Sequence, residues 1–202
     1  MTTTGDRFSY NPEDHTYRVN GKRLLSITQI LSIAGMTDTT WYTAAAADKG
    51  SRIHTLTEKM DEGRLDIRSV DPPLQPYLEA YRAFKRDTGI RITAVEYPCY
   101  NLVYRIAGTI DRIALFRNTP AVIDIKTGST APWHPLQTAG YVLILDGDYE
   151  RFNLYLSAGG TYRLIQHRDP LDTQVFIAAL TVAYWNYETS RGKAGETGHS
   201  RR

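Results

Sequence analysis

The sequence AGTIDRIALFRNTPAVIDIKTG, Ala107 to Gly128, is a strongly apolar stretch near the middle of the chain. Its two runs, 109–116 and 121–126, are rich in isoleucine, valine, leucine and alanine. The β-branched residues among these favour strands. Because the link RNTP between the runs is short, we predict that the second strand folds back antiparallel on the first.

Each predicted strand carries an aspartate, Asp111 in the first and Asp124 in the second. Side chains alternate between the two faces of a strand, so Asp124 and Lys126 share a face, and Ile123 and Ile125 point the other way. Antiparallel pairing would bring Asp111 within one or two rungs of Asp124. The stretch therefore predicts two carboxylates and one amine at a common site.

Two ionised carboxylates that close repel each other unless a cation lies between them. Oxygen ligands suit Mg²⁺ or Mn²⁺, and such an ion polarises phosphoryl oxygens and activates water. Lys126 would then hold the attacking water or offset developing charge. A structural interpretation stays open: Asp124 and Lys126 form an ordinary ion pair, and Asp111 pairs with Arg112 or caps a turn.

Residues before this stretch predict short strands followed by helices. Segment 8–25 alternates in polarity and contains the turn signals Asn-Pro and Asn-Gly, which favour a hairpin. Ser26 is a predicted N-cap of a short helix that Gly35 ends. Further helices are expected over 43–62 and, after a Pro-Pro pair, over 74–89.

The remaining elements complete an α/β domain. They are expected to be strands at 91–99 and 102–116, a loop and helix over 131–145, a hairpin over 151–168 turned at Gly159-Gly160, and a last helix over 169–188. This order predicts a mixed β-sheet flanked by helices. We expect one domain over 1–188, in which 1–40 form a hairpin and short-helix appendage, and a disordered polar tail over 189–202.

Composition limits the class of protein. The 202 residues carry a net charge of +2, so a nucleic-acid site would need its positive charge concentrated locally. Cys99 is the single cysteine, which excludes an internal disulfide framework and suits a reducing cytoplasm. There is no apolar run of about 18 residues and no signal-peptide pattern at the N-terminus. We expect a cytoplasmic protein, in a bacterial cell or a phage-infected host, with no membrane segment.

Several motifs together resemble a known family. GTID, VIDIKTG and QTAGY, in this order, closely resemble the RecB-like branch of the PD-(D/E)XK nuclease superfamily. GSRIH, residues 50–54, resembles the G-x-x-x-H helix motif of that branch, and residues 137–141 match its Q-x-x-x-Y motif. The segment HTYRVNGKRLLSITQIL is similar to the corresponding part of phage and mitochondrial-maintenance exonucleases. Order and spacing agree from about residue 50 to 142.

The resemblance implies a restriction-endonuclease-like core, with a central mixed β-sheet flanked by helices, and a role for each matching residue. Lys126 would be the catalytic lysine, together with Asp111 and Asp124. Gln137 and Tyr141 would face the DNA backbone and this lysine. The implied metal ligands are His54, Glu96, Asp111, Asp124 and the backbone carbonyl of Ile125.

Simpler interpretations of the supporting residues remain open at this point. His54 can be a packing histidine, and Glu96 a solvated strand residue. Gln137 and Tyr141, four residues apart and on one helix face, can anchor a helix to the sheet.

The chain also departs from the family pattern. Ile110 stands where the superfamily name has proline, as is usual in this branch. Relatives with an iron–sulfur cluster need four cysteines, so one cysteine excludes that cluster. The implied cofactor is one or two Mg²⁺ or Mn²⁺ ions. No helicase motif is present, so any unwinding would come from a partner.

The resulting hypothesis is a metal-dependent deoxyribonuclease, an exonuclease that hydrolyses single-stranded DNA or DNA ends in recombination, repair or phage DNA metabolism. Its expected partners are DNA and a recombinase, a single-strand-binding protein or a helicase. The alternatives are a structure-specific endonuclease, a catalytically silent nucleic-acid-binding module with the same fold, and an unrelated α/β protein with coincidental motifs.

Overall fold

The computed structural model describes residues 5–37 and 43–196, with side chains described as far as Ser190. In these residues eight strands form one mixed sheet in the order β1-β2-β3-β5-β6-β7-β8, with β4 paired to β5 outside this path. The strands are β1 (Phe8–Asn11), β2 (Thr16–Val19), β3 (Lys22–Ser26), β4 (Arg91–Asn101), β5 (Ile106–Phe116), β6 (Thr119–Lys126), β7 (Glu150–Leu156) and β8 (Tyr162–His167).

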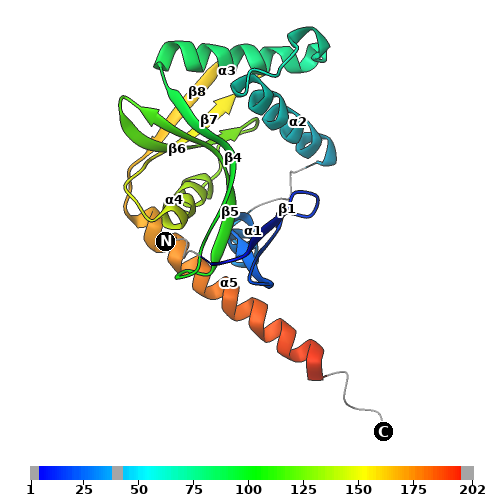
Figure 1. Ribbon diagram of the computed structural model, residues 1–202, viewed down its shortest axis with the longest axis vertical. Helices are drawn as coiled ribbons and strands as arrows, with labels where there is room; N and C mark the ends of the chain where they lie inside the picture. The colour runs from blue at the N-terminus through cyan, green and yellow to red at the C-terminus, as the bar shows by residue number, and fades with distance from the viewer. Residues whose placement is uncertain (1–4, 38–42, 197–202) are drawn as a thin grey trace.

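Helices cover both faces of the sheet (Figure 1). They are α1 (Ile27–Ile33), α2 (Ala44–Asp61), α3 (Gln75–Thr88), α4 (His134–Leu145) and α5 (Leu171–Glu196), with short 3₁₀ turns at Ile67–Ser69 and Pro72–Leu74. Helices α2 and α3 pack on one face, where Ile123 and Ile125 of β6 are buried. Helices α1, α4 and α5 pack on the other face against Val122. Because the side chains of β6 alternate between the two faces, this strand contributes residues to both cores. The predicted mixed sheet flanked by helices is confirmed.

Strand β5 is where the sheet divides. Its partner β4 runs antiparallel along one edge, from Ile106 to Leu115. On its other edge β6 pairs antiparallel with residues 112–116, whereas β3 pairs parallel with residues 106–107. Between these two pairings, residues 108–111 have neither β3 nor β6 as a ladder partner. We call this gap in the pairing, which ends at Asp111, the sheet fork.

Local sequence explains where the helices begin and end. Ser26 caps α1 in a capping box with Gln29, whose backbone N–H donates to Ser26 Oγ at 3.1 Å. Helix α3 ends at Gly89, whose φ of 59° is left-handed and suits glycine. In α4, a Cβ on Gly140 would lie 2.8 Å from Phe176 Cζ of α5. A glycine therefore lets these two helices approach closely.

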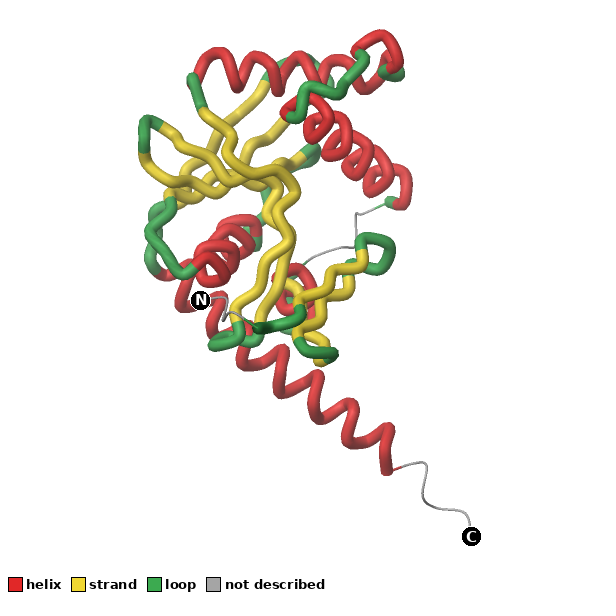
Figure 2. The backbone as a smooth tube through the Cα atoms, in the orientation of Figure 1, coloured by secondary structure: helices red, strands yellow, loops and turns green. Residues whose placement is uncertain are grey.

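Two boundaries differ from the predicted ones. The predicted strand over 102–116 begins only at Ile106, because 102–105 form the turn from β4. The predicted tail from Thr189 is wrong as far as Glu196, because α5 continues through these residues, and its end extends away from the body in Figure 2. Thr189 and Ser190 hydroxyls donate to Asn186 O, so both polar residues fit the helix. The rest of the predicted tail, 197–202, lies outside the described residues. No described helix is both long and apolar enough to cross a lipid bilayer.

Candidate active site

Three carboxylates form a row across neighbouring strands beside the sheet fork. The β4–β5 register pairs Val95 with Arg112 and Tyr97 with Ile110, so Glu96 lies between these pairs at the level of Asp111. The β5–β6 ladder ends at Arg112 and Ile123, and the next position along it is that of Asp111 and Asp124. The predicted proximity of the two aspartates is therefore seen in the register, and Glu96 extends the row to a third strand.

The side chain of Asp111 takes the place of a backbone acceptor at the end of the β5–β6 ladder. The Ile125 N–H donates to its Oδ2 at 2.6 Å, and the residue is 7% exposed. Burial raises the pKa of this carboxyl, the nearby His54 lowers it, and Glu96 raises it. A carboxylate so placed both fixes the end of β6 and offers its remaining lone pairs to a cation.

His54 reaches the row from α2. This helix packs on the face of β6 that carries Ile123 and Ile125, opposite to the face of Asp124. Its Nε2 lies 3.0 Å from Ile125 O, and its Nδ1 lies 3.6 Å from both Glu96 Oε1 and Asp111 Oδ2. Burial opposes the charged form, but Asp111 and Glu96 outweigh it and raise the pKa of His54 to about 9. With Nε2–H donating to the carbonyl, the proton that the ring holds below this pKa lies on Nδ1 and faces the carboxylates. The predicted ligand carbonyl of Ile125 is thus already bonded to His54.

His54, Glu96 and Asp111 are the donor cluster of the site. One ligand atom from each lies within 4.8 Å of those of the other two. A nitrogen and carboxylate oxygens at these separations fit a divalent cation. Of the predicted ligands, Asp124 is the one side chain outside this cluster.

Glu96 is held in an unusual backbone conformation. Its φ of 41° lies in the left-handed region, which residues other than glycine seldom adopt. Such a conformation costs about 1–3 kcal/mol and persists where surrounding structure imposes it. Arg112 Nη1 donates to Glu96 Oε1 at 3.1 Å and helps to fix the carboxylate beside His54.

Asp124 is surrounded by donors and is 1% exposed. Its Oδ2 accepts from Asn153 Nδ2 at 2.8 Å and lies 2.8 Å from Lys126 Nζ. Tyr141 donates its hydroxyl to Oδ1 at 3.3 Å. Burial raises the pKa of Asp124, whereas the ammonium of Lys126 lowers it. The arrangement orients Lys126, so the ion pair considered from the sequence does exist.

Gln137 and Tyr141 project from α4 and close a ring of hydrogen bonds with that ion pair. Lys126 Nζ donates to Gln137 Oε1 at 2.8 Å, and Gln137 Nε2 donates to the Tyr141 hydroxyl at 2.8 Å. Both α4 side chains are buried. They act on the lysine and Asp124 directly, and Trp133 packs over the same ammonium, with Nζ 5.0 Å from its ring centre.

Arg112 is a fully buried cation that the sequence interpretation did not place correctly. Its guanidinium donates to the backbone carbonyl of Asp111, not to that carboxylate. It also pairs with Asp61 Oδ2 at 2.7 Å and bonds Thr57 Oγ1, both on α2. Arg112 therefore ties α2, the helix of His54, to the strand of Asp111.

Asn153 was also missed. It lies in the apolar strand RFNLYL and is fully buried. A polar side chain in so apolar a strand was the available signal, because a buried amide needs a partner. The partner, Asp124, is on the neighbouring parallel strand, and the pairing of β6 with β7 could not be deduced from spacing.

Two cavities are bordered by residues that contact Asp124. One, of about 440 Å³, is bordered by Lys126, Trp133 and the loop between them. The other, of about 280 Å³, is bordered by Gly108, Thr109 and Tyr141. Lys126 and Tyr141, which both contact Asp124, thus each border a cavity where a substrate can lie.

One family model matches this chain, and the comparison with solved structures gives weaker similarities. The model of the PD-(D/E)XK nuclease superfamily matches residues 68–175, more than half of the chain, and begins after His54. A phage-related exonuclease structure from Haemophilus somnus 129PT is similar with a TM-score of 0.47 and 12% identity, covering 85% of this chain and 96% of that one. An alkaline exonuclease from Laribacter hongkongensis has a TM-score of 0.45 and 12% identity, covering 85% and 94%. No curated protein sequence matches significantly.

Proposed function

The chain belongs to the PD-(D/E)XK nuclease superfamily, and on this basis we propose that it is a metal-dependent deoxyribonuclease that degrades single strands or ends of DNA. The observation that carries the proposal is the donor cluster of His54, Glu96 and Asp111 beside the Asp124–Lys126 pair. A site that only binds DNA has no need of several carboxylates facing a polyanion. These acids are useful where a cation is held against the phosphate.

The donor set fits Mg²⁺ or Mn²⁺, as one ion or two. His54 Nδ1, Glu96 and Asp111 would hold the cation, and Asp124 could join them if it released Lys126. A divalent cation bound there would polarise a phosphoryl oxygen and lower the pKa of a water molecule. Because ligating histidine must be neutral, His54 would give up its proton on binding.

Lys126 is the group that would act on the substrate. Its ammonium is held by Asp124 and Gln137 and is 15% exposed, at the border of the 440 Å³ cavity. There it can donate to a non-bridging phosphate oxygen or to the attacking water. A fixed positive charge in a partly desolvated site stabilises charge that develops in the transition state. Tyr141 and Asn153 would keep Asp124 in place while Lys126 changes partners.

The exonuclease subtype is proposed because the order of motifs resembles that of single-domain exonucleases. Its proposed setting is DNA recombination, repair or phage DNA metabolism, where a recombinase, a single-strand-binding protein or a helicase could supply the DNA.

The test is cleavage of labelled linear single-stranded, linear double-stranded and closed circular DNA, with Mg²⁺ or Mn²⁺ and with EDTA. We expect metal-dependent loss of linear substrates and no cutting of closed circles. Lys126→Ala should remove most activity, on the order of 100-fold or more. Lys59→Ala, which removes an exposed lysine of α2, should not.

Three outcomes would contradict parts of the proposal. Cutting of closed circles would favour a structure-specific endonuclease. Metal-independent binding without cleavage would favour a silent binding module. Full activity in Lys126→Ala would show that the assigned lysine is wrong.

A further inference from the structure

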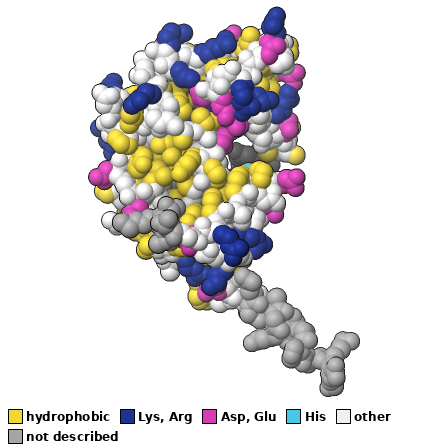
Figure 3. All heavy atoms as spheres, in the orientation of Figure 1, with side chains coloured by type: hydrophobic (Ala, Val, Ile, Leu, Met, Phe, Trp, Pro, Cys, Tyr) yellow, Lys and Arg dark blue, Asp and Glu magenta, His cyan; other side chains and the backbone are white. Residues whose placement is uncertain are grey.

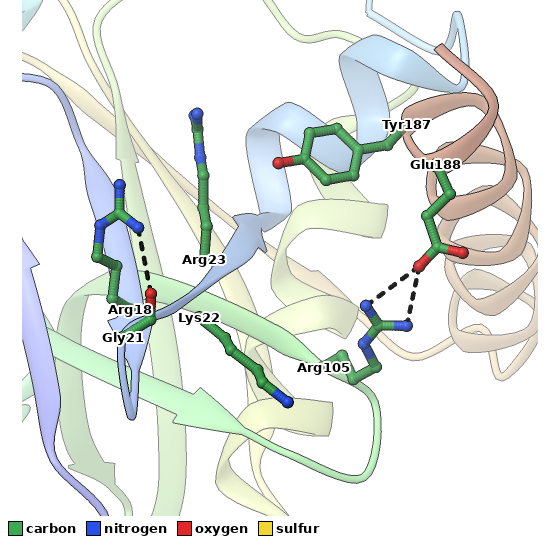
Figure 4. A pocket seen from close by; sticks show the side chains of 7 residues that line it. All are labelled: Arg18, Gly21, Lys22, Arg23, Arg105, Tyr187 and Glu188. Atoms are coloured by element: carbon green, nitrogen blue, oxygen red, sulfur yellow. Dashed lines mark hydrogen bonds and ion pairs between the residues drawn. The ribbon is translucent and has the colours of Figure 1, made fainter. Parts of the chain in front are cut away.

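A second group of charged side chains lies away from the donor cluster, where the β2–β3 hairpin and the β4–β5 turn face α5. They border a cavity of about 710 Å³, here called the basic pocket (Figure 4). Its polar lining consists of Arg18, Lys22, Arg23, Arg105, Tyr187 and Glu188. Figure 3 shows Lys and Arg side chains gathered near the point where α5 leaves the body. No step of the proposed chemistry uses this pocket.

Two of the arginines oppose each other on neighbouring strands. The register of β2 and β3 pairs Arg18 with Arg23 directly, and Figure 4 shows both side chains projecting the same way. Like charges directly opposite on a sheet are destabilising. An anion between the guanidinium groups would remove this repulsion, and guanidinium binds phosphate through paired hydrogen bonds.

Most of the positive charge in the basic pocket is not neutralised by the side chains that the structure describes. Arg105 pairs with Glu188 at 3.2 Å. The acidic side chain of the lining therefore neutralises one of its four cations. Arg18 Nη1 donates to the carbonyl of Gly21 at 3.2 Å, a contact that leaves its charge uncompensated. Among the described side chains, Lys22 and Arg23 have no ion pair. Three uncompensated cations therefore face one cavity.

We propose that the basic pocket binds the phosphodiester backbone of the DNA strand whose scissile bond lies at the donor cluster. This rests on the proposed nuclease function and extends it to a second binding site. All four cations are exposed at the surface, as suits an extended polyanion, whereas pockets for small ligands are mostly apolar and enclosed. Phosphate contacts of this kind position the strand and carry no sequence preference.

The two sites are far enough apart to need a strand of several nucleotides. Arg105 and Asp111 lie six residues apart along the chain into β5, which is about 20 Å at the rise of a strand. That distance corresponds to about six nucleotide steps of a DNA strand at duplex rise. The basic pocket would therefore affect how firmly a long strand is held and leave the chemistry at the cut unchanged.

The experiment measures binding of a fluorescent oligothymidine of about 30 nucleotides over about 50 to 200 mM salt, with EDTA present to prevent cleavage. The test variant is Arg18→Gln/Arg23→Gln. The control is Arg82→Gln/Arg91→Gln, which removes two exposed arginines on α3 and β4. We expect the test variant to bind at least about 10-fold more weakly and to lower the salt slope by about 1.4, or 0.7 for each lost phosphate contact. The control should change affinity by less than about twofold.

The inference and the proposed function fail in different ways. If test and control variants keep the wild-type affinity and slope while the wild type cleaves DNA, the basic pocket is not a backbone site and the nuclease proposal stands. If the slope depends on Arg18 and Arg23 but no DNA is cleaved with any metal, the inference stands and the nuclease proposal fails. Absence of DNA binding by the wild type overturns the inference.

Two further arms complete the test. Displacement of the oligonucleotide by millimolar inorganic phosphate would identify the pocket as a site for free phosphate and overturn the inference. Thermal unfolding followed by circular dichroism checks that each variant folds. Arg23→Gln alone replaces the double variant if that one does not fold, because no ion pair is lost with it; a salt slope lowered by about 0.7 is then the expected result, and an unchanged slope is the contrary one.

Discussion

Asp111 serves the backbone and the donor cluster with the same carboxylate. Its Oδ2 accepts the N–H of Ile125 while lying 3.6 Å from His54 Nδ1. Substitution with asparagine separates these two roles. The amide oxygen can keep the backbone hydrogen bond, but the negative charge of the carboxylate is removed. The site therefore allows metal affinity to be tested without removing the end of the ladder.

We expect Asp111→Asn to weaken Mn²⁺ binding by at least about tenfold, because the charge of the ligand set controls affinity for hard cations. Isothermal titration calorimetry measures the change. Asp48→Asn, which removes an exposed acid of α2, is the matched control and should bind Mn²⁺ like the wild type. Equal affinities of the Asp111 variant and the control would place the cation elsewhere.

His134 gives the stability of the protein a dependence on pH. It is 5% exposed, and its Nδ1 lies 2.8 Å from the Tyr155 hydroxyl. Burial, and then the charge of Lys126, lowers its pKa to about 4. An unfolded histidine titrates near about 6.5, so the unfolded chain binds more protons in the interval between these values. The contribution of His134 is present above pH 6.5 and is lost as pH falls toward 4.

At pH 5 this loss amounts to about 2 kcal/mol relative to pH 7. His134→Asn, which retains an acceptor near the Nδ1 position, should lose correspondingly less stability over the same interval. Urea unfolding of the wild type and the variant at the two pH values measures this loss of stability in each. Subtracting one loss from the other removes the contribution of other titrating groups. Parallel losses in the two proteins would mean that His134 is not held neutral.

At the scale of elements, α4 depends on a glycine where it crosses α5. A Cβ on Gly140 would lie 2.8 Å from the ring of Phe176, a fully buried side chain. Gly50 of α2 is the natural control, because a Cβ there would lie 3.6 Å from Thr127 Oγ1, an ordinary contact. Alanine substitutions at these two helical glycines therefore separate the effect of helix propensity from that of packing.

We expect Gly50→Ala to raise the free energy of unfolding by up to about 1 kcal/mol, the propensity difference. Gly140→Ala should lower it by about 1–3 kcal/mol through overpacking. Chemical denaturation of both variants gives the two values. A gain in stability at both positions would show that Phe176 can move aside at little cost.

The central elements could be predicted from sequence because their determinants are local. The short link between 116 and 121 fixes the antiparallel pair, and the alternation of side chains then fixes which residues accompany Asp124. Ser26 and Gln29 likewise mark the start of α1. These signals lie within a few residues of the feature that they determine.

The missed features come from contacts distant in sequence. The parallel pairing of β3 with β5 joins residues about eighty positions apart in the chain, and no local pattern encodes it. The same holds for Asn153 beside Asp124 and for Arg112 beside Asp61. The left-handed backbone of Glu96 depends on its neighbours in the sheet, since the residue type itself disfavours it.

At the scale of the whole molecule, the N-terminal strands are packed into the main sheet. Tyr17, Val19 and Leu24 share a third core cluster with Tyr100 and Ala107 of β4 and β5. Tyr17 also bonds Thr109 through its hydroxyl at 2.9 Å. The segment predicted as an appendage is therefore attached to the central strands by its apolar side chains.

We expect one cooperative unfolding transition, because all three core clusters contain residues of β5. Far-UV circular dichroism and tyrosine and tryptophan fluorescence should give the same midpoint in urea. The first reports the helices and sheet, and the second includes Tyr10 and Tyr17 of the N-terminal strands. An earlier transition in fluorescence alone would identify the N-terminal strands as a separately folding unit.

The sheet fork makes the interval 108–111 of β5 a spacer between two parts of the molecule. Inserting one residue there would turn Asp111 to the opposite face, away from its partners. Inserting two would restore its orientation but move the hairpin and the acids apart by about 7 Å. The length of this interval therefore fixes both the orientation of Asp111 and its distance from the N-terminal hairpin, so an insertion there should abolish or displace the cation site without altering either core.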